Sequence, residues 1–217
     1  MIALDTVAVG FLAGGQARRM GGKDKPLLSI GGQTILDRQL DATALHKVRV
    51  INANGDLSRF ESYGLPVIPD SLPDWPGPLA GILSCLDWLA QSHCECDLLL
   101  SCATDAPFIS SDLAFRLLRA RTVENAMLAQ ARSSGRRHPV FGLWPVSIRH
   151  DLRTALTEES ITGTANAFGR TMQSRSRCSA VRVYLLTRCY RQGQRWLCRT
   201  LSSRKSTKVE EIFQEAV

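Results

Sequence analysis

The sequence predicts an α/β domain with a largely parallel central sheet flanked by helices. In the first three quarters of the chain, short apolar runs alternate with stretches whose apolar residues recur at helical spacing, a pattern typical of parallel strands joined by helices. The chain has 217 residues, of which 44% are hydrophobic, so one domain can bury a sizeable core without disulfides.

The first expected elements are a buried strand at residues 7–12, an amphipathic helix at 34–45 and a second strand at 48–52. The helix is predicted because Ile35, Leu36 and Leu40 recur at the helical period. A short strand is expected at 66–69, a helix at 79–90 opened by Pro76-Gly77-Pro78, and a strand at 97–102.

Further along, Ser110 or Ser111 is expected to cap a helix that reaches about Arg121, because a hydroxyl can accept from an unpaired N–H of the first turn. The remaining expected elements are strands near 126–130 and 139–143, a helix from 147 to about 156, a strand at 181–186 and a short acidic helix at 209–217.

The composition divides the chain near residue 160. Residues 1–159 carry a net charge of −1, whereas residues 160–217 carry +8, so all the excess of the overall +7 lies in the last quarter. A nucleic-acid footprint across the whole domain is therefore excluded, and only the tail could supply one. We expect one α/β domain at 1–160 and an atypical basic segment at 161–217.

Two explanations of the basic segment stay open. It is rich in Arg, Ser, Thr and Cys and contains no Asp, which a shift of reading frame near Ile161 would explain. The second explanation is a genuine extension of the same domain. Its cations are interleaved with Tyr184, Tyr190 and Trp196, a pattern that suits an anionic partner or single-stranded nucleic acid.

The sequence favours a reduced, cytoplasmic location. No apolar run reaches the roughly 18 residues of a membrane-spanning helix, and the N-terminus lacks the pattern of a signal peptide. The seven cysteines are odd in number, and Cys94 and Cys96 are too close together for the usual pair of zinc ligands. We therefore expect neither a disulfide framework nor a zinc site.

The strongest functional motif is the loop LAGGQARRMGGKDKPL at residues 12–27, which follows the first strand. Its two Gly-Gly pairs let successive N–H groups approach phosphate oxygens, and its arginines and lysines supply positive charge. The pattern matches neither a P-loop, since Gly22-Lys23 is followed by Asp24, nor the dinucleotide fingerprint G-x-G-x-x-G. A kinase of the P-loop class or a dehydrogenase is therefore disfavoured.

This loop resembles the signature loop of the molybdenum cofactor guanylyltransferases, which belong to the nucleotidyltransferases of Rossmann-like, nucleotide-diphospho-sugar transferase fold. The resemblance continues in order at Asn52-Ala53-Asn54, Pro69-Asp70-Ser71, Pro76–Gly81 and Ala103–Phe108, and extends to about Leu156. Family members usually carry a later Asn-x-Asn-Thr-Pro-Glu segment, which is missing from this sequence.

The resemblance implies transfer of GMP from Mg²⁺-bound GTP to molybdopterin, with release of pyrophosphate. It also implies contact with proteins that supply or receive the molybdenum cofactor. In this reaction one anion attacks another, and the two repel each other. Cations that neutralise the triphosphate and a metal that bridges its oxygens reduce this repulsion.

Site residues are assigned from the resemblance position by position. Arg19 and Lys25 would hold the β- and γ-phosphates, and Asp105 would bind Mg²⁺, which prefers carboxylate, phosphate and water oxygens. The expected nucleotide-binding residues are Leu12, Ala13, Gly14, Gly15, Lys25, Asn52, Asp70, Gly77 and Gly81.

Some of these assignments have structural alternatives. Asp70 could read the guanine N1–H and 2-amino group, or Asp70 could instead be an ordinary cap and Asn52 a turn residue. His138 stands in a basic-His-Pro segment that would suit a pterin phosphate, although a lone histidine is more often structural.

Competing functions also stay open. A cytidylyltransferase or a sugar-phosphate nucleotidyltransferase would share the loop and Asp105, and a non-catalytic GTP-binding protein would result if the altered C-terminus left the site incomplete.

Overall fold

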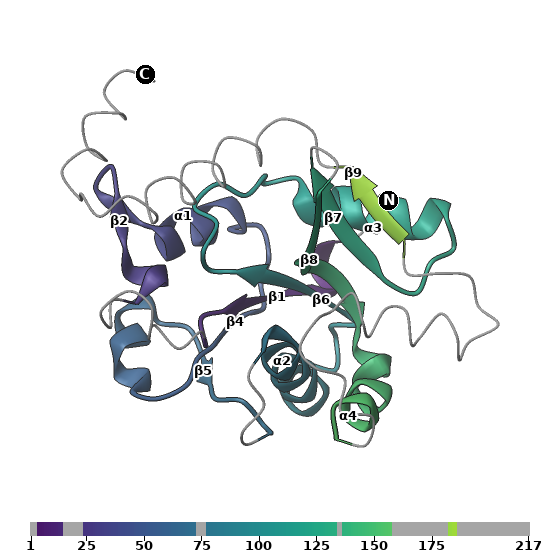
Figure 1. Cartoon of the computed structure of the whole chain (residues 1–217), viewed down its shortest axis with the longest axis horizontal. Coiled ribbons are helices and arrows are strands. Elements are labelled where there is room, and N and C mark those ends of the chain that lie inside the picture. The colour runs from purple at the N-terminus through teal and green to yellow at the C-terminus, as the bar shows by residue number, and fades with distance from the viewer. Residues whose placement is uncertain (1–3, 15–23, 73–76, 134–135, 158–181, 186–217) are drawn as a thin grey trace.

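A seven-stranded sheet forms the centre of the computed structural model, which describes residues 4–14, 24–72, 77–133, 136–157 and 182–185 (Figure 1). Its strand order is β5-β4-β1-β6-β8-β7-β9. The strands are β1 (Val7–Leu12), β4 (Arg49–Asn52), β5 (Val67–Ile68), β6 (Leu98–Ala103), β7 (Ala129–Ser133), β8 (Arg136–Pro145) and β9 (Arg182–Leu185). The helices are α1 (Ile35–Ala42), α2 (Pro78–Ser92), α3 (Leu113–Val123) and α4 (Arg149–Thr157).

The sheet is mostly parallel, as the sequence predicted. Strand β1 pairs in parallel with β4 and β6, β4 with β5, and β7 with β9; only β8 runs antiparallel to its neighbours β6 and β7. Continuous apolar runs such as Val7–Leu12 form the central strands because both faces of the sheet are covered.

Helices cover the sheet on both faces (Figure 1). Along β1, Val7, Val9 and Phe11 pack into one apolar core with α1 and α3, whereas Ala8 packs into a second core with α2 and α4. The alternation follows from the period of two along a strand, which sends successive side chains to opposite faces. The result is a three-layer α/β fold.

The boundaries of two helices differ from the prediction. Helix α1 ends at Ala42 rather than near Leu45, because the Thr43 hydroxyl donates to the carbonyl of Gln39 and the chain then turns, leaving Leu45 78% exposed. The expected serine cap of α3 is wrong. The N-cap is Asp112, without a side-chain capping bond, and the Ser110 hydroxyl donates to the Asp112 carboxylate instead.

Two strands also differ from the sequence prediction. The expected strand at 126–130 begins three residues later, after a turn in which Asn125 has a positive φ of 48°. Strand β8 is twice the expected length, because it pairs with β6 on one side and β7 on the other.

The prediction missed several short elements: the hairpin of β2 (Ser29–Ile30) with β3 (Gln33–Thr34), the 3₁₀ helix η4 (Leu57–Tyr63) and the 3₁₀ turns η1 (Leu4–Thr6) and η3 (Lys25–Leu27). Such short segments carry too few residues for a periodic signal.

The basic segment contributes one described element, strand β9, close to the predicted strand at 181–186. Residues 209–217 lie outside the described part of the chain, and the division at residue 160 stays a prediction. Among the described residues, no helix is both long and apolar enough to cross a membrane.

Candidate nucleotide-binding and transfer site

Four neighbouring parallel strands end in register at one edge of the sheet. Leu12 at the end of β1 pairs with Asn52 of β4 and with Ala103 of β6, and Asn52 pairs in turn with Ile68 of β5. Ligands of open α/β sheets bind outside the carboxyl ends of the strands. The segments that follow these four strand ends carry most of the predicted site residues, and they therefore meet in one place.

Asp70 lies at the centre of a hydrogen-bonded group. Its Oδ1 accepts from Asn52 Nδ2 at 2.9 Å, and its Oδ2 accepts from Asn54 Nδ2 at 2.7 Å. The Asp70 N–H donates to Asn54 Oδ1 at 2.9 Å, so the two residues contact each other through both ends of the amide. The carboxylate is thereby fixed in direction and remains half-buried at the edge of the sheet.

Two of the predicted glycines pack against this group. A Cβ atom on Gly81 would lie 2.2 Å from Asn52 Oδ1, and one on Gly14 would lie 3.2 Å from Asn54 Nδ2. A side chain at position 81 would displace Asn52, and one at position 14 would crowd Asn54, and both asparagines hold Asp70. Gly77 is the N-cap of α2, and Gly81 lies in the first turn of that helix.

The first residues of the glycine loop are fixed by their neighbours. The Ala13 N–H donates to the carbonyl of Asn52 at 2.8 Å, and the Leu12 carbonyl accepts from the Thr104 hydroxyl at 2.9 Å. Contacts of Leu12 and Ala13 with a nucleotide would therefore use their other backbone atoms. The predicted Gly15 and Arg19 lie outside the described residues.

Asp105 follows β6 in a turn, and its side chain is exposed. No residue in the described part of the chain forms a hydrogen bond or an ion pair with its carboxylate. The described residues contain no group of three or more His, Cys, Asp or Glu side chains that could hold a metal. One exposed carboxylate suits Mg²⁺, which usually keeps several waters and binds one or two carboxylates together with phosphates.

Lys25 lies at the far end of the glycine loop, next to an ion pair that the sequence did not predict. The preceding residue, Asp24, forms a half-buried ion pair with Arg59 Nε at 3.0 Å. Arg59 also donates to the carbonyl of Asn54 at 2.9 Å and stacks over the ring of Phe60. Arg59 thus links the segment of Lys25 to the segment of Asn54.

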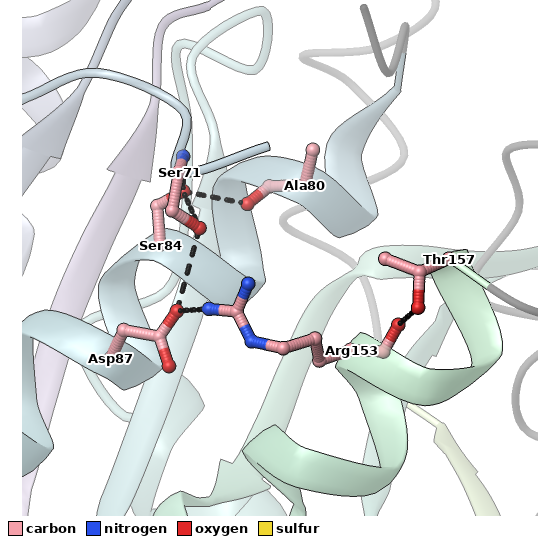
Figure 2. A network of polar contacts seen from close by, with 6 residues as sticks. All are labelled: Ser71, Ala80, Ser84, Asp87, Arg153 and Thr157. Atoms are coloured by element: carbon pink, nitrogen blue, oxygen red, sulfur yellow. Dashed lines mark hydrogen bonds and ion pairs between the residues drawn. The ribbon is translucent and has the colours of Figure 1, made fainter. Parts of the chain in front are cut away.

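Ser71, the neighbour of Asp70, belongs to a second polar group (Figure 2). Its N–H donates to the Ser84 hydroxyl at 2.7 Å, and Ser84 donates in turn to the carbonyl of Ala80 on α2. Asp87 of α2 lies 3.4 Å from the Ser71 hydroxyl and accepts from Arg153 of α4 at 2.5 Å. The Asp70–Ser71 segment is thereby tied to two helices.

Sequence reasoning missed Ser84, Asp87 and Arg153. Ser84 and Asp87 give one signal in the sequence, since they are polar residues within the apolar stretch of α2. Arg153 gives none, because it lies 66 residues further along the chain than its partner Asp87.

His138 lies in surroundings that favour the structural alternative to phosphate binding. It is buried on β8, and its Nε2 lies 2.7 Å from the Ser133 hydroxyl. Burial, together with the positive charge of Arg136, lowers the pKa of His138 from the usual 6.5 to about 4. The imidazole is therefore neutral at pH 7, whereas Arg136 and Arg137 are exposed.

A mostly parallel sheet with polar groups at its carboxyl edge is an architecture in which α/β proteins bind nucleotides. A family model described as "MobA-like NTP transferase domain" matches residues 9–174. The chain belongs to this family.

Curated relatives are similar over about 70% of the chain. A protein of Nitrobacter hamburgensis named molybdenum cofactor guanylyltransferase is 50% identical over 152 residues, which cover 70% of this chain and 73% of that protein. A Bradyrhizobium protein of the same name is 50% identical over 152 residues, covering 70% and 72%.

Solved structures share the fold at low sequence identity. The molybdopterin-guanine dinucleotide biosynthesis protein A from Archaeoglobus fulgidus aligns with a TM-score of 0.61 and 17% identity, over 96% of this chain and 99% of that one. A 4-diphosphocytidyl-2C-methyl-D-erythritol synthase from Anaerococcus prevotii aligns with a TM-score of 0.63 and 14% identity, over 99% and 96%. Both confirm the predicted fold.

Proposed function

We propose that the chain transfers GMP from Mg²⁺-bound GTP to molybdopterin and releases pyrophosphate. The observation that carries the proposal is the meeting of Gly14, Asn52, Asp70 and Asp105 at four strand ends that lie in register. The names of the relatives at 50% identity support the choice of substrates.

Guanine selection is assigned to the group around Asp70. The N1–H and 2-amino group of guanine are adjacent donors, and a carboxylate with two oxygens can accept from both. Asn52 and Asn54 each use one lone pair of the Asp70 carboxylate, which leaves acceptor capacity on both oxygens. No described residue donates to Asn52 Oδ1, so this atom can accept from the ribose or the base.

Phosphate alignment is assigned to the glycine loop and Lys25. An oxygen of the acceptor phosphate forms a bond to the α-phosphorus of GTP, the bond from that phosphorus to the bridging oxygen breaks, and pyrophosphate leaves. The acceptor phosphate is already an anion at neutral pH, so no general base is required. Lys25 neutralises charge on the leaving phosphates.

The exposed Asp105 would hold the divalent metal that nucleotidyltransferases of this family typically need, and we propose Mg²⁺. When bound, the metal would neutralise phosphate charge and polarise the α-phosphate. We also propose transient contact with proteins that supply and receive the molybdenum cofactor, and a cytoplasmic location. Both of these rest on the proposed reaction.

Pyrophosphate release from GTP and molybdopterin in the presence of Mg²⁺ tests the proposal. We expect release by the parent chain and its loss in Asp105→Ala, because the variant lacks the metal carboxylate. The matched control is Asp151→Ala, which removes another exposed carboxylate from the first turn of α4. Full activity of Asp105→Ala would contradict the metal role.

The choice of nucleotide is tested separately by thermal unfolding with Mg²⁺ and each triphosphate, since a ligand stabilises the state that binds it. We expect GTP to raise the melting temperature more than CTP or UTP. A preference for CTP or UTP would favour a cytidylyltransferase or a sugar-phosphate nucleotidyltransferase. Binding of GTP without release of pyrophosphate would favour a non-catalytic protein.

A further inference from the structure

Gln39 on α1 is a fully buried polar residue to which the proposed reaction gives no role. Its side chain is 0% exposed. The amide Nε2 donates to the carbonyl of Ala103 at 2.8 Å and to the carbonyl of Ala106 at 2.8 Å. These two carbonyls lie on either side of Asp105 in the sequence.

The orientation of the Gln39 amide follows from its partners. Both contacts are carbonyl oxygens, which only accept, so the NH₂ end must face the turn. The other end of the amide, Oε1, is buried and has no hydrogen-bond partner among the described residues. A buried acceptor without a partner costs free energy, which offsets part of what the two N–H bonds contribute.

The turn that carries Asp105 is therefore held from two sides. The Thr104 hydroxyl donates to the carbonyl of Leu12 on β1, and Gln39 bridges the two ends of the turn from α1. Asp105 itself contributes no bond to this arrangement within the described residues. The backbone from which the Asp105 side chain projects is thus held in place, and no described residue bonds to its carboxylate.

We infer that Gln39 is a positioning residue that sets the direction of the Asp105 carboxylate toward a divalent cation bound with the triphosphate. The inference rests on the proposed function, since it concerns the same site. Residues that orient a metal ligand typically change metal affinity or activity by about 10- to 100-fold when they are replaced. Replacing Gln39 is expected to change mainly the metal affinity, because its two hydrogen bonds go to the backbone on either side of Asp105.

The experiment measures the binding of Mn²⁺ to the protein–GTP complex by electron paramagnetic resonance, alongside pyrophosphate release as a function of Mg²⁺ concentration. Gln39→Met keeps the length of the side chain and removes both N–H donors. We expect the Mn²⁺ dissociation constant and the half-saturating Mg²⁺ concentration to rise about 10-fold or more. Rates at saturating Mg²⁺ should fall less.

Gln130→Met is the matched control. Gln130 is a buried glutamine on β7 with 1% exposure, and neither of its polar side-chain atoms has a hydrogen-bond partner among the described residues. Its replacement removes a buried amide without releasing a carbonyl at the Asp105 turn. We expect parental metal affinity in this variant.

Gln39→Glu keeps the inference testable if Gln39→Met does not fold. A protonated carboxyl retains one O–H donor toward the turn, whereas an ionised one retains none. Because burial favours the protonated form, Gln39→Glu keeps only one of the two donors, and its Mn²⁺ affinity should fall below that of the parent by more than any fall seen in Gln130→Glu. The absence of this additional weakening would overturn the inference.

The possible outcomes separate the two proposals. Parental metal affinity in Gln39→Met would overturn the positioning role while leaving the proposed reaction intact. A parent that binds Mn²⁺ and GTP but releases no pyrophosphate would refute the reaction, and the Mn²⁺ titrations would still decide the role of Gln39. A parent that binds no metal with GTP would overturn both.

Discussion

Replacing Gly81 by alanine places a methyl group against the residue that holds Asp70. The new Cβ would lie 2.2 Å from Asn52 Oδ1, 3.0 Å from Asn52 Cγ and 3.3 Å from Leu12 Cδ2. Asn52 is 2% exposed, and its Nδ2 is held by the carbonyl of Ile68 and by Asp70. The amide can make room only by weakening these two bonds.

Stability and binding are expected to respond differently to this change. Overpacking costs about 1–3 kcal/mol, while alanine gains about 1 kcal/mol over glycine in a helix, so the net loss of unfolding free energy is about 0–2 kcal/mol. A hydrogen bond to a charged group contributes about 1.5–3 kcal/mol, so misdirecting the Asp70 carboxylate should weaken GTP binding roughly 10- to 100-fold.

Calorimetric titration with GTP and Mg²⁺, together with urea unfolding, separates these two effects. Gly142→Ala is the matched control, since its Cβ would lie 3.0 Å from Trp144 Nε1 and 3.2 Å from the carbonyl oxygen of Ala129, with no contact to Asn52. We expect this control to lose stability while it keeps its affinity for GTP. Parental GTP affinity in folded Gly81→Ala would refute the role assigned to Asn52 and Asp70.

Three further predictions follow from the described side chains. Asp87→Asn should lower the unfolding free energy by less than about 1 kcal/mol, because its ion pair with Arg153 is partly exposed, and a larger loss in urea titrations would contradict this. The folded state lowers the pKa of His138 to about 4, so its contribution to stability is complete above pH 6.5 and is lost as pH falls toward 4. His138→Gln should therefore show a shallower loss over that interval, and unfolding curves that stay parallel to those of the parent would disprove it. Iodoacetamide should label the exposed Cys94 and spare Cys102, whose pKa burial raises to about 12; peptide mapping that finds Cys102 labelled in the native protein would refute this.

The sequence was sufficient for the layered fold because burial has a strong periodic signal. Strand Val7–Leu12 has apolar residues on both faces, and the helices that follow have apolar residues at helical spacing. The sequence prediction was wrong at the N-cap of α3. Ser110 precedes the helix by a suitable number of residues for a cap, but its hydroxyl donates to the Asp112 carboxylate. The predicted strand at 139–143 was also shorter than β8, because pairing with β6 and β7 extends the strand beyond its apolar centre.

The placement of the motif residues could likewise be predicted, whereas their geometry could not, and their roles stay predictions. Asn52 ends a strand and Asp70 and Asp105 follow strand ends, and parallel strands bring such ends to one edge. The sequence does not say that Asp70 accepts from two asparagines, or that Gly81 is required because a side chain there would strike Asn52.

The apolar periodicity and the glycine loop depend on residues that are close together along the chain, and the order of the motifs resembles that of a known family. These features predicted the fold and the class of enzyme from sequence alone. The tertiary structure decided which residues support them. Gln39 lies 67 positions before the Ala106 carbonyl that it holds, and Arg153 lies 66 positions after Asp87. Hydrogen bonds between such distant residues follow from how the helices pack on the sheet, and no local pattern records that packing.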